Sequence, residues 1–189
     1  MRAIRLVIVL AWAGLCLAAS LQQLNVKFKV PGYFVALPNI RAKPIDVLPA
    51  TEKITLKAFP DRAVAFGKYE GFAVVLANAT RKKLIFESQD SRINIVREAL
   101  DADGRWKPIE YLPNGFCGNS YYAVFLPARR SWTFRAPHYN GPFKTRMRFV
   151  LEQQDLKLVS NEFAGSINRE QFTVVRKPEP WDIMDPYSD

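Results

Sequence analysis

The side chains best suited to covalent chemistry are few in this sequence. Beyond residue 20 it holds one cysteine, Cys117, and one histidine, His138. A thiol becomes a nucleophile when a neighbouring base takes its proton, so a cysteine-dependent hydrolase would have to use this pair. Zinc takes four ligands, and this pair would need carboxylates from elsewhere to complete a site. Free cysteines are mostly buried and inert, so we expect a non-enzymatic protein with no metal or cofactor, and the hydrolase is the alternative.

Three acidic residues show a spacing that resembles part of a calcium loop. Asp101 and Asp103 match the start of an EF-hand loop, but Gly104 stands at its fourth place and Glu110 at its tenth. That loop takes glycine at its sixth place and glutamate at its twelfth. Asp-Gly between two apolar runs is instead typical of a β-hairpin, because glycine accepts a positive φ. We therefore expect a tight turn here, with the two flanking strands paired antiparallel.

Basic residues provide the candidate binding site. The formal net charge is +9, and the cations are spread along the whole sequence. Alternation in the run from 144 to 151 places three of them on one face of a strand, about 6.6 Å apart. Three arginines that precede this strand are expected to join the row, and guanidinium groups bind anions bidentately. The candidate site comprises Lys144, Arg146, Arg148, Arg129, Arg130 and Arg135. A basic row also guards a strand against edge pairing, which is the simpler interpretation of these residues.

Residues 1–20 have the parts of a secretory signal peptide. Arg2 and Arg5 precede an apolar run at 6–19, and small residues follow at 18–20. The run is shorter than the roughly 20 residues that span a bilayer. We expect cleavage after residue 20 and export to the periplasm or the extracellular space, with no stable membrane span afterwards. Export argues against a nucleic-acid partner.

The remaining chain divides into three parts by composition. Prolines recur through residues 21–53, which excludes a long helix, yet the apolar content is too high for a solvated linker. This segment is therefore predicted to be an extended arm packed on the domain. Residues 54–176 contain short β-rich runs separated by turn signals, the pattern of an all-β, antiparallel β-sandwich. Residues 177–189, with prolines and acids, are predicted to be a flexible tail.

The strand predictions depend on the period of apolar residues. Alternation buries Trp132 and Phe134 in one run and Met147 and Phe149 in another. Residues 160–168 show no period and are predicted to form a loop or a single helical turn. The candidate strands are residues 54–59, 72–78, 83–88, 93–100, 105–110, 120–126, 131–135, 144–151, 157–159 and 171–175.

Several short motifs carry a resemblance. The segments 125–127 (Phe-Leu-Pro), 131–134 (Ser-Trp-Thr-Phe) and 141–143 (Gly-Pro-Phe) lead into a long alternating strand. Together with the apolar strand that ends in Asn-Ala-Thr at 78–80, they resemble bacterial exported immunoglobulin-like or fibronectin-like domains. The resemblance covers about residues 54–175 and implies an immunoglobulin-like β-sandwich. The cysteine pair of antibody domains is missing, and Phe143 stands where a corner tyrosine is expected.

These features predict a binding or structural module of the cell envelope that contacts anionic or carbohydrate components. Its expected partner is an envelope protein or an anionic glycan. Two alternatives remain open: a cysteine-dependent hydrolase that uses Cys117 and His138, and a strand-pairing assembly subunit or periplasmic chaperone.

Overall fold

The structure is a computed structural model that describes residues 21–32, 34–36, 41–45, 51–112 and 118–176. The predicted signal peptide, Cys117 and the predicted tail lie outside these residues.

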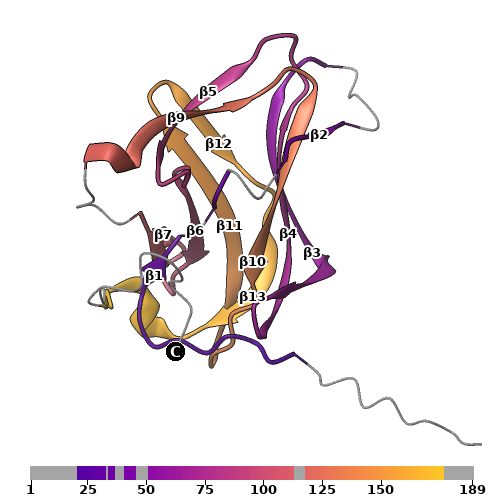
Figure 1. Cartoon of the computed structure of the whole chain (residues 1–189). Helices are drawn as coiled ribbons and strands as arrows, with labels where there is room; N and C mark the ends of the chain where they lie inside the picture. The colour runs from indigo at the N-terminus through magenta and orange to yellow at the C-terminus, as the bar shows by residue number, and fades with distance from the viewer. Residues whose placement is uncertain (1–20, 33, 37–40, 46–50, 113–117, 177–189) are drawn as a thin grey trace, which may run out of the picture.

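The described chain consists almost entirely of β-strands (Figure 1). Two short 3-10 turns, η1 (Gly118–Ser120) and η2 (Arg169–Phe172), accompany them. None of the helical segments in the described ranges is long and apolar enough to cross a membrane. The strands are β1 (Val30–Pro31), β2 (Lys43–Pro44), β3 (Ile54–Phe66), β4 (Tyr69–Asn78), β5 (Leu84–Gln89), β6 (Ile95–Leu100), β7 (Trp106–Pro108), β8 (Glu110–Tyr111), β9 (Tyr121–Leu126), β10 (Arg130–Pro137), β11 (Phe143–Gln153), β12 (Leu156–Val159) and β13 (Phe163–Ile167).

Two sheets form the body of the fold. One has the strand order β2-β10-β4-β3, and the other has the order β12-β11-β6-β7 with β13 also paired to β11. All the ladders within these two sheets are antiparallel. The sheets stand opposite each other in Figure 1, and the all-β antiparallel sandwich predicted from the sequence is confirmed.

The core lies between the two sheets, where alternation directs large apolar side chains. Trp132 and Phe134 of β10 are buried, as are Met147 and Phe149 of β11, and this confirms the predicted faces. Phe72 of β4 lies 6.1 Å from Phe149 between ring centroids, so rings from both sheets are in contact. Burying each large side chain contributes about 1.5–3 kcal/mol, and these rings are therefore a main source of stability.

Strands β5 and β9 form a separate two-stranded ribbon near the top of the view in Figure 1. Its inner face is apolar: Phe86 lies 5.7 Å from Trp132 between ring centroids. Val124 and Leu126 on the partner strand are also fully buried. The ribbon is therefore fixed to β10 by its inner face, and its outer face is left for solvent.

The arm predicted for residues 21–53 enters the core. Leu24, Val30 and Phe34 are all buried. The ring of Phe34 lies 5.4 Å from Phe134 of one sheet and 5.5 Å from Phe149 of the other, between centroids. The described part of the arm thus packs at the seam between the sheets, and β1 and β2 add short pairings with β8 and β10.

Near the C-terminal end the structure differs from the predicted strands. The predicted loop at 160–168 contains β13, and the predicted strand at 171–175 begins within η2. In η2 the side chain of Gln171 accepts a hydrogen bond at 3.1 Å from the backbone N–H of Asn168, which closes the turn. The sequence of β13, Phe-Ala-Gly-Ser-Ile, has too little contrast between its faces to show a period of two.

Candidate functional site

The three basic residues on β11 share one face, as predicted, but they are largely paired with acids. We call Lys144, Arg146 and Arg148 the β11 row. Arg146 Nη1 lies 2.7 Å from Glu162 Oε2, and Arg148 Nη2 lies 2.8 Å from Glu98 Oε2. The β11 row therefore exposes much less uncompensated charge than its sequence indicates.

The three arginines expected to extend that row belong to the other sheet. Arg129 immediately precedes β10 and Arg130 begins it. Arg135 lies near the end of β10, where its Nη1 donates to the carbonyl oxygen of Ala65 at 3.4 Å. Because β10 and β11 belong to opposite sheets, the predicted single row is split between the two outer faces.

Arg129 and Arg130 instead join cations from other segments. The cluster cations come from β2, from the loop between β4 and β5, and from the turn that leads into β10 together with its first residue, and all are exposed. We call this set the basic cluster: Lys43, Arg81, Lys82, Lys83, Arg129 and Arg130.

The buried side chain of Asn78, at the end of β4, holds two of these segments together. Its Nδ2 donates to the carbonyl oxygens of Lys82 at 2.8 Å and Pro127 at 3.1 Å. Its Oδ1 accepts from the backbone N–H of Thr80 at 3.1 Å. The backbone N–H of Arg129 donates to Thr80 O at 3.3 Å. A buried amide with these partners is strongly fixed, so it sets the position of the loop that carries residues 81–83.

Strand β2 brings the third segment to the cluster. Lys43 lies opposite Ser131 in the antiparallel ladder between β2 and β10, and Pro44 lies opposite Arg130. The guanidinium of Arg130 donates from Nη1 to the carbonyl oxygen of Ala42 at 3.3 Å. Backbone pairing therefore places Lys43 beside the turn that carries Arg129.

Within the part of the chain that the structure describes, the basic cluster has little compensating negative charge. Arg81 Nε lies 2.5 Å from Glu52 Oε1, the one carboxylate that pairs with the cluster among the described residues. Within those same residues Lys43, Lys82 and Arg129 form no ion pair. Like charges this close create a positive potential that attracts anions and weakens as salt screens it.

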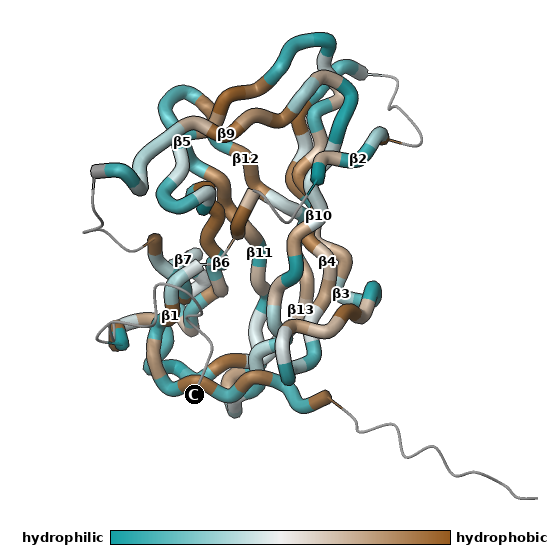
Figure 2. Tube along the Cα trace, viewed as in Figure 1, coloured by the Kyte–Doolittle hydropathy of each residue, from teal (hydrophilic) through white to brown (hydrophobic). Residues whose placement is uncertain are grey.

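Apolar side chains adjoin the cluster on the outer face of the β5–β9 ribbon. Ile85 and Phe125 are directly opposite each other in the ladder, with 58% and 46% of their surface exposed. Lys83 Nζ lies 4.9 Å from the centroid of the Phe125 ring. Figure 2 shows a hydrophilic loop at the top of the view beside hydrophobic stretches of β5 and β9. We call Ile85 and Phe125 the apolar pair.

His138 lies at the opposite end of β10, half-buried against the ring of Phe72 at 4.7 Å between centroids. Desolvation lowers the pKa of His138, while the carboxylate of Glu70, 3.8 Å from Nε2, acts in the opposite direction. Because Cys117 lies outside the described residues, the hydrolase hypothesis stays a prediction. In those residues no three His, Cys, Asp or Glu side chains gather as metal ligands would.

A buried ionic group, which the sequence analysis did not identify, lies between the sheets. Arg97 of β6 is fully buried, its Nε 3.4 Å from Glu110 Oε1, and its Nη1 donates to Pro137 O at 2.9 Å. The Tyr139 hydroxyl donates to Glu110 Oε1 at 2.7 Å. Burial raises the pKa of Glu110, whereas Arg97 and Tyr139 favour its ionised form. The alternation Ile95, Arg97, Ala99 was the signal for this inward-facing charge.

The predicted hairpin at 101–104 is confirmed. Strands β6 and β7 pair antiparallel, and Gly104 has a φ of 77°. Asp101 Oδ1 accepts from the backbone N–H groups of Asp103 and Arg105, each at 2.9 Å, and Oδ2 lies 2.8 Å from Lys107 Nζ. These donors hold the pKa of Asp101 well below its usual range. Asp101 therefore stabilises the turn.

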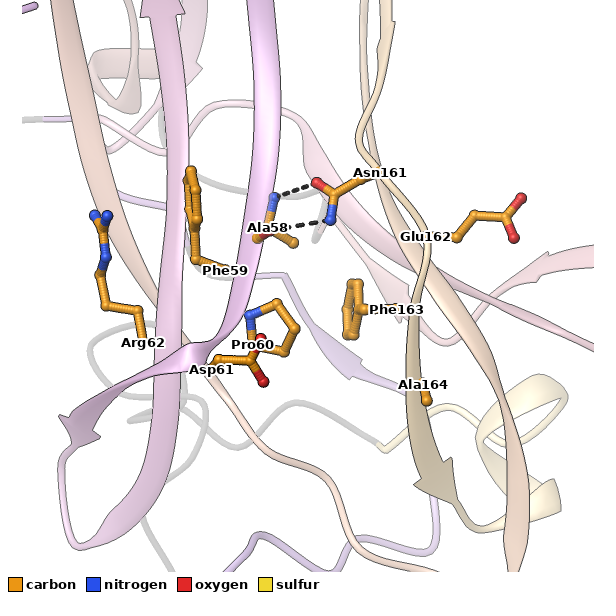
Figure 3. A pocket seen from close by; sticks show the side chains of 9 residues that line it. All are labelled: Ala58, Phe59, Pro60, Asp61, Arg62, Asn161, Glu162, Phe163 and Ala164. Carbon is orange, nitrogen blue, oxygen red and sulfur yellow. Dashed lines mark hydrogen bonds between the residues drawn. The ribbon is translucent and has the colours of Figure 1, made fainter.

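A groove of about 690 Å³ lies between β3 and β13 (Figure 3). Asn161 and Phe163 point toward β3 in this view, whereas Glu162 points away. Asn161 Oδ1 accepts from the backbone N–H of Ala58 at 2.9 Å, and Nδ2 donates to Ala58 O at 3.1 Å. The side chain thus occupies hydrogen-bonding groups at the edge of β3 that another strand would use.

Sequence reasoning included Arg129 and Arg130 but missed their neighbours. The run Arg81-Lys82-Lys83 is visible in the sequence as three consecutive cations, which is the signal that could have identified it. Its proximity to Lys43 and Arg129 depends on Asn78 and on the pairing of β2 with β10, which only the folded chain shows.

Comparison with known proteins gives no identification. No family model matches the chain, and no curated protein matches it. The resemblance to immunoglobulin-like domains stays a prediction, and any functional conclusion must rest on the residues themselves.

Proposed function

We propose that the protein is an exported, non-enzymatic binding module of the cell envelope that holds anionic material through the basic cluster. The proposal rests on one observation: six exposed cations from three separate segments are gathered at one end of the fold, with Glu52 as their paired carboxylate in the described chain.

The cluster fits a polymeric or surface-bound anion better than a single small ion. Its side chains are exposed, so each contact with a single anion is weak in water. Several such contacts made at once add up, because the first contact holds the next anionic groups nearby. Arginine adds bidentate contacts to phosphate, sulfate or carboxylate groups. Binding of this kind is strong at low ionic strength and falls as salt is added.

The test compares the cluster with the β11 row. One variant carries Lys82→Ser, Lys83→Ser and Arg129→Asn. Asparagine suits position 129 because Arg129 has a φ of 56°, a conformation that asparagine tolerates better than most residues. The rival variant carries Lys144→Ala, Arg146→Ala and Arg148→Ala, which removes the same number of charges. Dextran sulfate serves as the soluble polyanion.

We expect the cluster variant to lose on the order of a hundredfold in affinity at low salt, at about 1 kcal/mol for each cation. The rival variant should change affinity by less than about threefold, since its arginines are already paired. Equal losses in both variants would indicate non-specific attraction by net charge. A wild-type protein that does not bind dextran sulfate, or a larger loss in the rival variant, would refute the proposed site.

The strand-pairing alternative is less well supported. At the edge of β3, the side chain of Asn161 already hydrogen-bonds the backbone N–H and C=O of Ala58. Pro60 has no backbone N–H to donate, and the register of β3 against β4 shifts between Phe59 and Ala63. Such devices are used to protect edge strands from pairing with other chains. We therefore favour the charged surface over the strand edge as the site of binding.

A further inference from the structure

We propose that the anionic partner is the surface of a phospholipid layer, with the apolar pair entering the headgroup region while the basic cluster binds lipid phosphates. This inference rests on the proposed function and adds the class of partner.

The outer face of the β5–β9 ribbon carries apolar side chains in contact with solvent. The inner face already supplies Phe86, Val124 and Leu126 to the core. A ribbon with one buried face normally carries polar residues on the other. Ile85 and Phe125 are nevertheless exposed and face each other across the two strands. The core does not require these two apolar side chains.

Positive charge lies next to the apolar pair. Lys83 immediately precedes β5, and its Nζ lies 4.9 Å from the Phe125 ring centroid. Arg129 and Arg130 follow β9 closely along the chain, and Asn78 ties the loop of Lys82 to the end of that strand. Cations therefore border the apolar pair on the side where both strands meet the cluster.

This combination fits a lipid surface better than a soluble polyanion. Anionic headgroups attract nearby lysine and arginine, and apolar side chains gain by leaving water for the boundary with the acyl chains. A soluble polyanion offers the first interaction and lacks the second. The apolar pair therefore distinguishes the two partners, and the cluster alone does not.

The experiment uses protein expressed with its own first twenty residues, purified after export, with its N-terminus sequenced. Removal of residues 1–20 matters because their apolar run would itself bind lipid. Binding is measured by co-sedimentation with vesicles of phosphatidylglycerol and phosphatidylcholine, with vesicles of phosphatidylcholine alone, and with dextran sulfate. The double variant Ile85→Ser/Phe125→Ser tests the apolar pair.

A matched control removes two exposed apolar side chains from elsewhere, with Val159→Ser and Val174→Ser. We expect the Ile85→Ser/Phe125→Ser variant to bind anionic vesicles about tenfold more weakly than the wild type and to bind dextran sulfate equally well. The control variant should match the wild type with both partners.

A single Phe125→Trp variant supplies a second readout. Its fluorescence should shift to shorter wavelength with anionic vesicles, because the indole leaves water, and it should stay unchanged with dextran sulfate. The wild-type background contains Trp106, Trp132 and Trp181, so the shift is read as the difference from wild-type emission.

The outcomes separate this inference from the proposed function. If the cluster variant weakens binding to both partners while the Ile85→Ser/Phe125→Ser variant changes neither, the proposed function stands and the lipid inference is wrong. If the cluster variant binds both anionic vesicles and dextran sulfate as the wild type does, the proposed function itself is wrong. A double variant that converts a dimer to a monomer without altering vesicle binding would assign the apolar pair to a second copy of the chain and overturn the inference.

Discussion

Arg97 is a guanidinium enclosed by aromatic rings. Its central carbon lies 4.3 Å from the ring centroid of Tyr139 and 4.9 Å from that of Phe149. Removing a charge from water costs several kcal/mol, and the contacts with Glu110 and the ring faces offset that cost. The pair fixes the relation of β6 to β8 because its interactions require a specific geometry.

We predict that Arg97→Met destabilises the protein by about 3–5 kcal/mol, because Glu110 is left buried without its cation. The loss should be smaller at mildly acidic than at neutral pH. Burial raises the pKa of Glu110 and Arg97 lowers it, so without Arg97 the folded state binds this proton still more tightly relative to the unfolded state. The stabilisation that this proton provides is complete below the pKa that Glu110 has in the unfolded state. It is lost as the pH rises through the pKa of Glu110 in the folded state.

Urea unfolding at both pH values measures this effect. The double variant Arg97→Met/Glu110→Leu is the control and should recover most of the stability, since both charges are then removed. An Arg97→Met protein with the stability of the wild type at neutral pH would show that the ion pair does not stabilise the fold.

Among the strands, β3 has the edge with the most evident protection. Its ladder with β4 shifts register between Phe59 and Ala63, and Pro60 lies in the shifted segment. The side chain of Asn161 bonds both backbone groups of Ala58, much as a neighbouring strand would. A bulge, a proline and a side-chain cap therefore act on one edge.

We predict that Asn161→Ala costs on the order of 1 kcal/mol, because two hydrogen bonds to Ala58 are lost at a partly solvated edge. The free edge should also increase self-association, which analytical ultracentrifugation over a range of concentrations measures. Asn161→Asp is the control: it retains the acceptor for Ala58 N–H and loses the donor to Ala58 O. If the Asn161→Ala protein stays monomeric and keeps the stability of the wild type, Asn161 does not protect the edge of β3.

Strands were predicted well where one face of the strand is apolar and the other polar, and poorly where the two faces have similar polarity. Alternation located β10 and β11 because Trp132 and Met147 contrast with polar neighbours. Strand β3 was predicted to end at Phe59, since a proline follows, yet a register shift lets it continue to Phe66. Within the candidate site, Arg129 and Arg130 were predicted from the sequence. The spacing of cations along β11 could not show that these two arginines lie on the sheet opposite to β11.

Across the whole molecule, the arm links parts of the fold that are distant in sequence. Phe34 is 3% exposed and contacts rings of both sheets. The carbonyl oxygen of Val26 accepts from Nδ2 of Asn168 at 2.8 Å. These contacts make the arm part of the cooperative unit.

We predict that Phe34→Ala destabilises the protein by about 3–5 kcal/mol and leaves a single unfolding transition. Phe28→Ala in the same arm is the control and should cost less, because Phe28 is only half-buried. Thermal unfolding followed by near- and far-ultraviolet circular dichroism makes the comparison. Two separate transitions in the wild type would contradict the prediction that arm and sandwich unfold together.

The seam also constrains the order in which the chain reaches its native state. Lys29 forms a bridge with Val175, and Asn25 accepts from Asn168 at 2.8 Å, so early residues need late ones as partners. Contacts between distant residues are slow to form, because the intervening loop must close first. A chain that emerges from a membrane pore with its N-terminus first would therefore keep its arm open to chaperones and proteases until residues 168–175 had passed through.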